Sequence, residues 1–176
     1  MSLKSELITR NIYYFNFDIM NYSGIINCSI VDGSGFRTTL FISGCKHCCE
    51  GCHNPQTWDF KYGKPYTQEV EEILFDRISE DYIEGLTLSG GDPLYNADGI
   101  YELLVRFRER FGDTKNVWLY TGFSYEYCKE HFSKILDLCD VLVDGTYNCG
   151  ERDMTLAFRG SRNQRVINLK NGEEMF

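Results

Sequence analysis

From residue 24 onward, the sequence alternates between short apolar stretches that mostly end in glycine and longer amphipathic stretches. Strand-like segments occur at 24–31, 36–44, 85–91, 116–122 and 141–145, and helix-like segments at 66–82, 96–112 and 124–140. This alternation is typical of βα units around a parallel sheet. With about four or five units, the chain is too short for a complete eight-unit barrel. We therefore predict an α/β fold with a mostly parallel sheet, built as an open partial (β/α) barrel.

Local signals mark where these elements begin and end. Thr67 and Ser124 are expected to cap the first and third helices, because a hydroxyl can accept a hydrogen bond from the first turn. Gly112 is expected to end the second helix. In such sheets the functional loops follow the carboxyl ends of the strands. We therefore expect the loop after residue 44 to meet "SGGDP", "YTG" and "DGTY" at one rim.

The composition narrows the class of protein. The formal net charge over 176 residues is −8, and the chain has no run of Lys or Arg that could bind a phosphate backbone. We therefore expect no nucleic-acid partner. No apolar run is long enough to span a membrane, and the first residues lack the apolar core of a signal peptide. We therefore predict a cytoplasmic protein without a membrane partner. In the reducing cytosol, its eight cysteines are expected to be ligands or buried residues rather than disulfides.

Four of the cysteines crowd into one short loop, "CKHCCEGCHN", which begins at Cys45. A zinc site would use the pairs Cys45/Cys48 and Cys49/Cys52, but the neighbours Cys48 and Cys49 cannot easily point at one tetrahedral ion. An electron-transfer cluster would need four well-spaced thiolates. The spacing Cys45-x3-Cys49-x2-Cys52 instead offers three thiolates and leaves Cys48 as a bystander. Three ligands on a [4Fe–4S] cube leave one iron open, as a catalytic metal site requires.

The remaining cysteines bear on the electron-transfer alternative, which needs a fourth ligand. Cys128 and Cys139 fall on one face of the predicted helix 124–140, where buried apolar residues are the simpler interpretation. Cys28 lies in a predicted strand and is also expected in the core. Cys149 lies in a loop, and its surroundings predict no role. A fourth ligand from elsewhere in the chain is therefore not favoured, although this alternative stays open.

Seven motifs, taken together and in order, resemble one enzyme family. They are "DGSGFR", "LFISGC", "CEGCHNPQTWD", "LTLSGGDPLY", "VWLYTG", "VLVDGTY" and "FRGSRNQR". The chain is similar to the activating enzymes of anaerobic (class III) ribonucleotide reductases, which are radical S-adenosylmethionine (SAM) activases of glycyl-radical enzymes. The resemblance begins near "MNYSGI" at Met20 and runs to about Arg165. It implies a radical-SAM domain at 20–176, preceded by an N-terminal extension of unknown role at 1–19.

The resemblance implies a cofactor chemistry and a partner. Cys45, Cys49 and Cys52 are implied as the metal ligands of a [4Fe–4S] cluster whose fourth iron is open to SAM. One electron from a low-potential donor would cleave SAM to methionine and a 5′-deoxyadenosyl radical. That radical would abstract hydrogen from a glycine of the partner, the catalytic subunit of the anaerobic ribonucleotide reductase. The implied activity is that of a radical-SAM oxidoreductase.

The same resemblance implies which residues contact SAM. Gly90 and Gly91 would lie along its methionine part, with Asp92 near its ammonium; the alternative is that Asp92 caps the helix that follows. The backbone around the third ligand would meet the adenine, and polar groups further on would meet the ribose or carboxylate. The residues around the third ligand are Gly51, Cys52 and His53, and the polar groups further on are Asp144, Arg159 and Asn163. His47 is expected to be an exposed loop residue.

Two other functions stay open. The pair His53-Asn54 matches activators of a different glycyl-radical enzyme, a formate-lyase, whereas "SGGDPL" and the small size favour the reductase. A binding protein that houses zinc or an electron-transfer cluster would fill all four coordination positions and would ignore SAM.

Overall fold

The structure is a computed structural model that describes residues 20–176. The N-terminal extension predicted at 1–19 lies outside the described residues. The strands are β1 (Asn21–Ser29), β2 (Phe36–Ile42), β3 (Lys64–Pro65), β4 (Ile83–Gly90), β5 (Asn116–Tyr120), β6 (Val141–Asp144), β7 (Arg165–Asn168) and β8 (Glu173–Glu174). The α-helices are α1 (Gln68–Ile78), α2 (Ala97–Phe111), α3 (Tyr125–His131) and α4 (Ser133–Leu136). Three short 3-10 helices are η1 (Pro55–Trp58), η2 (Pro93–Asn96) and η3 (Cys149–Glu151).

The strands form one eight-stranded sheet in the order β3-β1-β2-β4-β5-β6-β7-β8. Neighbours β2, β4, β5 and β6 run parallel. The flanking pairs β1–β2, β1–β3, β6–β7 and β7–β8 are antiparallel. The predicted α/β class is confirmed, but the sheet is mixed rather than mostly parallel. Only the central strands are joined by crossovers that contain α-helices, whereas the flanking strands return through loops and can pair antiparallel.

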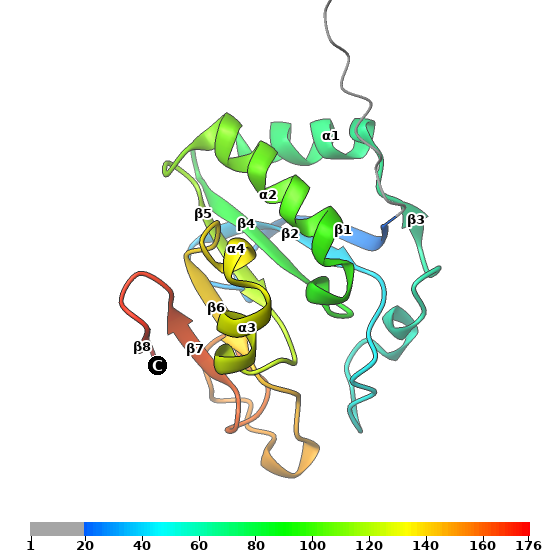
Figure 1. Ribbon diagram of the computed structural model, residues 1–176, viewed down its shortest axis with the longest axis vertical. Helices are drawn as coiled ribbons and strands as arrows, with labels where there is room; N and C mark the ends of the chain where they lie inside the picture. The colour runs from blue at the N-terminus through cyan, green and yellow to red at the C-terminus, as the bar shows by residue number, and fades with distance from the viewer. Residues whose placement is uncertain (1–19) are drawn as a thin grey trace, which may run out of the picture.

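The α-helices lie on one face of the sheet (Figure 1). The Thr67 hydroxyl accepts a hydrogen bond from the Val70 N–H at the start of α1, and the Ser124 hydroxyl accepts one from Tyr127 at the start of α3. Gly112, with φ of 53°, ends α2. The predicted caps are therefore confirmed. Within residues 20–176, no helix has both the length and the apolar character needed to cross a membrane.

The prediction of one helix over 124–140 is wrong. The backbone leaves helical geometry at Phe132 (φ −131°, ψ 26°), which separates α3 from α4. The Phe132 ring packs against Phe123, with 5.7 Å between ring centroids. Cys128 and Cys139 are nevertheless buried, at 0% and 8% exposure, as the helical pattern predicts. The break thus changes the helix without moving either cysteine out of the core.

Cys28 is exposed, so its predicted place in the core is wrong. The pairing of β1 with β2 shifts register between Ile26 and Ser29. Such an irregularity changes which face of the strand a side chain occupies. The apolar residues of the segment 24–31 could not reveal this register shift.

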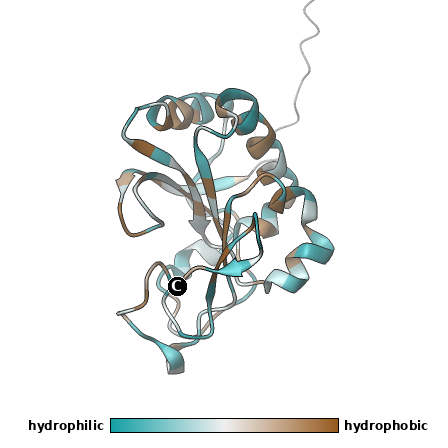
Figure 2. Ribbon diagram, turned by 90° about the vertical axis from the view of Figure 1, so that its left-hand side faces the viewer, coloured by the Kyte–Doolittle hydropathy of each residue, from teal (hydrophilic) through white to brown (hydrophobic). Residues whose placement is uncertain are grey.

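The main core lies between the sheet and the helices, and a smaller cluster lies on the opposite face. Val117 and Leu119 of β5 belong to the main core, whereas Trp118 between them packs with Val143 and Val166 in the second cluster. Successive side chains of a strand point to opposite faces, so both sides of the sheet are apolar at this position. Figure 2 shows apolar segments along the strands and on the helices.

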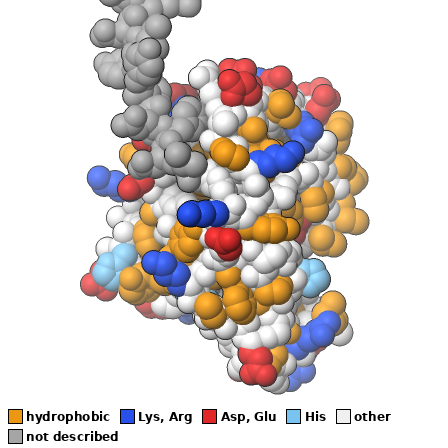
Figure 3. All heavy atoms as spheres, turned by 90° about the vertical axis from the view of Figure 1, so that its right-hand side faces the viewer, with side chains coloured by type: hydrophobic (Ala, Val, Ile, Leu, Met, Phe, Trp, Pro, Cys, Tyr) orange, Lys and Arg blue, Asp and Glu red, His pale blue; other side chains and the backbone are white. Residues whose placement is uncertain are grey.

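On the face drawn in Figure 3, lysine and arginine side chains are scattered among acidic and apolar ones rather than gathered in a stripe. The formal net charge of the chain is −8. A nucleic-acid backbone favours concentrated positive charge. The absence of a nucleic-acid partner stays a prediction.

Candidate functional site

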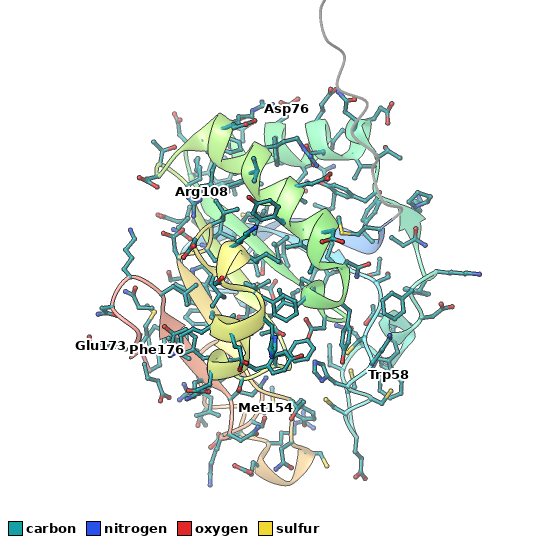
Figure 4. The ribbon with its side chains drawn as sticks, in the orientation of Figure 1. Trp58, Asp76, Arg108, Met154, Glu173 and Phe176 are labelled. Atoms are coloured by element: carbon teal, nitrogen blue, oxygen red, sulfur yellow. The ribbon has the colours of Figure 1, made fainter. Side chains whose placement is uncertain are left out.

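The carboxyl ends of the parallel strands meet around a cavity of about 440 Å³. The loops after β2, β4, β5 and β6 all line it, with Cys45, Gly91, Thr121 and Gly145 among their residues. The predicted meeting of these loops at one rim is therefore confirmed. The segment before β7 also contributes Tyr147, Arg152, Met154, Gly160 and Gln164. Trp58 and Met154, labelled in Figure 4, line the cavity from two different loops.

Three of the four cysteines of the cysteine loop line the cavity. Cys45, Cys49 and Cys52 line it, whereas Cys48 is exposed and does not. Cys48 also has a left-handed backbone, with φ of 50°. The structure thus separates Cys48 from the other three, as the spacing Cys45-x3-Cys49-x2-Cys52 requires.

Burial and backbone N–H groups act in opposite directions on the Cys45 and Cys49 thiols, and burial has the larger effect. Burial raises the pKa of the Cys45 thiol to about 11, while the backbone N–H groups of His47 and Cys48 act in the opposite direction. Burial also raises the pKa of Cys49, and the Tyr147 N–H opposes it. Backbone N–H groups aimed at sulfur favour the thiolate and are a feature of iron–sulfur sites. Metal binding would displace the thiol protons.

The spacing of the donors does not match a single ion. Within residues 20–176, no three His, Cys, Asp or Glu side chains lie close enough together to hold one metal ion. The three ligands of a four-iron cube bind three different irons and lie farther apart than the ligands of one zinc. The donor spacing among the described residues therefore gives no support to a tetrahedral zinc ion.

Gly90 and Gly91, at the end of β4, line the cavity where backbones approach closely. Gly90 has φ of 111°, and a Cβ there would lie 2.4 Å from the Ile42 carbonyl oxygen. A Cβ on Gly91 would lie 2.7 Å from the carbonyl oxygens of Gly44 and Thr57. No other residue fits either position without moving the backbone. The glycines therefore set how closely β4 meets the cysteine loop.

Gly51 and His53 flank the third cysteine of the loop and line the cavity. Gly51 has φ of 70°, and a Cβ there would lie 3.3 Å from the Cys149 Cβ. Cys149, for which the sequence predicts no role, therefore sits beside the cysteine loop. His53 is exposed at the edge of the cavity.

Asp92, which the resemblance places near the SAM ammonium, does not line the cavity. Its side chain is buried, and Oδ1 accepts a hydrogen bond from the Leu94 N–H at 2.9 Å, as a cap of η2. Oδ2 lies 2.8 Å from His47 Nε2, and it also accepts from the Gly122 N–H at 2.9 Å. Both oxygens therefore have protein partners, and the capping alternative is confirmed.

The three remaining predicted residues also lie outside the cavity lining. Asp144 is buried and accepts a hydrogen bond from the Tyr125 N–H at 2.7 Å. Arg159 pairs with Glu174 at 3.2 Å. The side-chain amide of Asn163 donates to the Thr146 carbonyl at 2.8 Å. In this structure each of the three side chains therefore has a partner within the protein.

The prediction that His47 is an exposed loop residue is wrong. Its side chain is 13% exposed, and its ring packs against Phe123 and Tyr95, with centroids 4.7 and 5.2 Å apart. Tyr120, Tyr147 and Arg152 also line the cavity, although the motifs assign them no role. Tyr120 and Tyr147 lie within the motifs "VWLYTG" and "VLVDGTY", and a position in a motif does not say where a side chain points.

Comparisons with known proteins agree with these features. A family model described as a 4Fe-4S single cluster domain matches residues 31–167. An anaerobic ribonucleoside-triphosphate reductase-activating protein of Enterobacteria phage T4 is 41% identical over 155 residues, which cover 87% of this chain and 97% of the relative. A protein of the same name from Escherichia coli K12 is 38% identical over 86% of this chain and 100% of the relative. One from Vibrio cholerae is 39% identical over 84% of this chain and 97% of the relative.

Proposed function

The chain belongs to the family of anaerobic ribonucleoside-triphosphate reductase-activating proteins and contains a 4Fe–4S domain, and we propose that it activates its reductase by reductive cleavage of SAM. The proposal rests on the observation that three of the four cysteines in the loop lie at the cavity. Cys45, Cys49 and Cys52 reach one cavity, while Cys48 does not. Three ligands leave one iron open for a substrate.

In this proposal Cys45, Cys49 and Cys52 would hold the cluster, and the backbone N–H groups beside Cys45 and Cys49 would favour the thiolate form of these two. When bound, the cluster would supply the one electron that cleaves SAM to methionine and a 5′-deoxyadenosyl radical, and this radical would take a hydrogen atom from a glycine of the reductase. The electron comes from a low-potential donor.

The cavity has a size and lining that support SAM as its ligand. A volume of about 440 Å³ lies within the range of small-molecule sites. Gly90 and Gly91 would let the methionine part approach the backbone, and Gly51 and His53 would lie near the adenine. Contacts from Asp92, Asp144, Arg159 and Asn163 remain predictions that require each side chain to exchange a present partner for SAM.

A reactive carbon radical needs a site from which water and stray substrates are excluded. The cavity opens at a rim formed partly by Arg152 and by Met154, which is 78% exposed. We propose that the glycine loop of the reductase covers this opening, so that activation requires a complex. In this proposal the mixed sheet corresponds to an open partial barrel of the radical-SAM type.

The first test is anaerobic reconstitution with iron and sulfide, followed by EPR of the reduced protein with and without SAM. We expect a [4Fe–4S]⁺ signal that changes when SAM is added. It should disappear in Cys45→Ala, Cys49→Ala and Cys52→Ala and survive in the matched control Cys48→Ala. Bound zinc, or a cluster that requires Cys48 and ignores SAM, would refute the proposal.

A second test addresses the partner. The reconstituted protein, SAM and a reductant are mixed with the anaerobic reductase, and the glycyl radical is sought by EPR. We expect the radical only when all components are present. A SAM-responsive cluster that never produces the radical on the reductase, but does so on a formate-lyase, would move the assignment to the other glycyl-radical enzyme.

A further inference from the structure

We propose that Asp92 and His47 form a clamp that holds the cysteine loop against the ends of β4 and β5. The two are positioning residues that act on the cluster through Cys45. This inference rests on the proposed function, in that it takes Cys45 to be a cluster ligand.

The clamp grips the loop on both sides of Cys45. The backbone N–H of Asp92 donates to the Gly44 carbonyl at 2.9 Å. The Asp92 carboxylate oxygen Oδ2 lies 2.8 Å from His47 Nε2. In the tautomer that carries its proton on Nε2, His47 donates to this carboxylate oxygen. One residue at the end of β4 therefore fixes the loop immediately before the first ligand and two residues after it.

The carboxylate is itself held by β5. The Thr121 hydroxyl lies 2.9 Å from Oδ2, and the Gly122 N–H donates to the same oxygen at 2.9 Å. Asp92 is 1% exposed, so these bonds form away from water, where hydrogen bonds to a charged group are strong. The cysteine loop and the ends of β4 and β5 thus share one buried carboxylate.

The His47 ring lies between two aromatic side chains and a glycine. It packs against Tyr95 and, edge to face, against Phe123. A Cβ on Gly122 would lie 2.5 Å from the ring, so the glycine leaves room for it. Ring packing and the hydrogen bond are two separable contributions, and they can be removed one at a time.

Two substitutions of His47 separate the ring packing from the hydrogen bond. His47→Phe keeps an aromatic ring but removes the donor, whereas His47→Gln removes the ring and keeps an N–H donor that can reach Asp92. His131→Phe is the matched control, since His131 is exposed on α3 and does not line the cavity. Asp92→Asn is a second way to weaken the clamp with nearly unchanged shape.

The first readout uses the cluster-free protein and needs neither SAM nor reductase. Amide hydrogen exchange is measured over the segment 44–49. We expect exchange about tenfold faster in His47→Phe and near wild-type exchange in His47→Gln, because a hydrogen bond to a charged group is worth about that factor.

The second readout is the reconstituted cluster. We expect His47→Phe and Asp92→Asn to lose iron to a chelator about tenfold faster than wild type and to shift the midpoint potential, while His47→Gln keeps both values. His131→Phe should match wild type.

The clamp is refuted if His47→Phe behaves as wild type, or if His47→Gln is as impaired as His47→Phe, which would assign the role to ring packing. A chain that binds no SAM but shows the expected exchange pattern would contradict the proposed function and leave the clamp intact.

Discussion

Arg37, from the motif "DGSGFR", is fully buried, with 0% exposure. Its guanidinium donates to Thr87 Oγ1 at 2.7 Å, to Asn116 Oδ1 at 2.6 Å and to the Leu86 carbonyl at 2.6 Å. It also lies over the Trp118 ring, 5.4 Å from the centroid. The motif therefore supplies a cation that joins β2, β4 and β5, and replacing it should destabilise the fold.

The size of the effect follows from two opposing contributions. Burial lowers the pKa of Arg37 from 12.5 to about 10, which corresponds to roughly 3 kcal/mol against the charged form. Three short hydrogen bonds from a charged donor contribute about 1.5–3 kcal/mol each and outweigh that cost. Truncation would also leave their acceptors unpaired. We therefore expect Arg37→Met to lower the free energy of unfolding by about 3–5 kcal/mol.

Urea and thermal unfolding of the cluster-free protein measure this change. A loss of that size should lower Tm by about 6–20 °C for a chain of this length. Arg110→Met is the matched control, because Arg110 pairs with Asp76 on the surface and such pairs are worth about 1 kcal/mol or less. Equal losses from the two substitutions would show that the buried network contributes no more than a surface pair, which would refute this account of Arg37.

Three further outcomes are expected. Gly90→Ala should cost about 2 kcal/mol or more of unfolding free energy in urea titrations, because its φ is 111° and β2 leaves no room for a Cβ; a neutral result would contradict the close approach of the β4 backbone to β2. In the native cluster-free protein, iodoacetamide should modify exposed Cys149 quickly and Cys128 only on unfolding, as mass spectrometry can resolve, since burial raises the pKa of Cys128 to about 12. The hydrogen bond from Arg165 lowers the pKa of Glu126 from 4.5 to about 2. The stabilisation of the fold by this pair should therefore be complete above about pH 4.5 and lost as pH falls toward 2. Glu126→Gln should flatten that part of the acid-unfolding profile, and an unchanged profile would count against the pair.

Features that depend on a few neighbouring residues could be predicted from the sequence. Thr67, Ser124 and Gly112 mark helix ends because a cap needs only one side chain or one backbone conformation next to the helix. The meeting of four loops at one rim was predictable for a similar reason. Parallel strands joined by helices present their carboxyl ends on the same side.

Features that depend on register or on distant partners could not be predicted. The exposure of Cys28 coincides with an irregular pairing of β1 with β2, and Phe132 at the helix break packs against the distant Phe123 ring. Neither event changes the local pattern of apolar and polar residues. The antiparallel return of β7 after β6 likewise depends on how a long loop folds back to the sheet.

The sequence by itself determined the donor set, the glycine-ended strands and the family, because ligand spacing and motif order are properties of the chain. The spacing Cys45-x3-Cys49-x2-Cys52 also predicts that Cys48 is left out, whereas tertiary structure supplied the cavity that the other three cysteines line. Tertiary structure also decided that Asp92 lies outside the cavity lining, joined to His47. The Asp92 carboxylate is bound by Thr121 and Gly122, which lie about 30 residues away in the chain, so only packing settles which partners it meets.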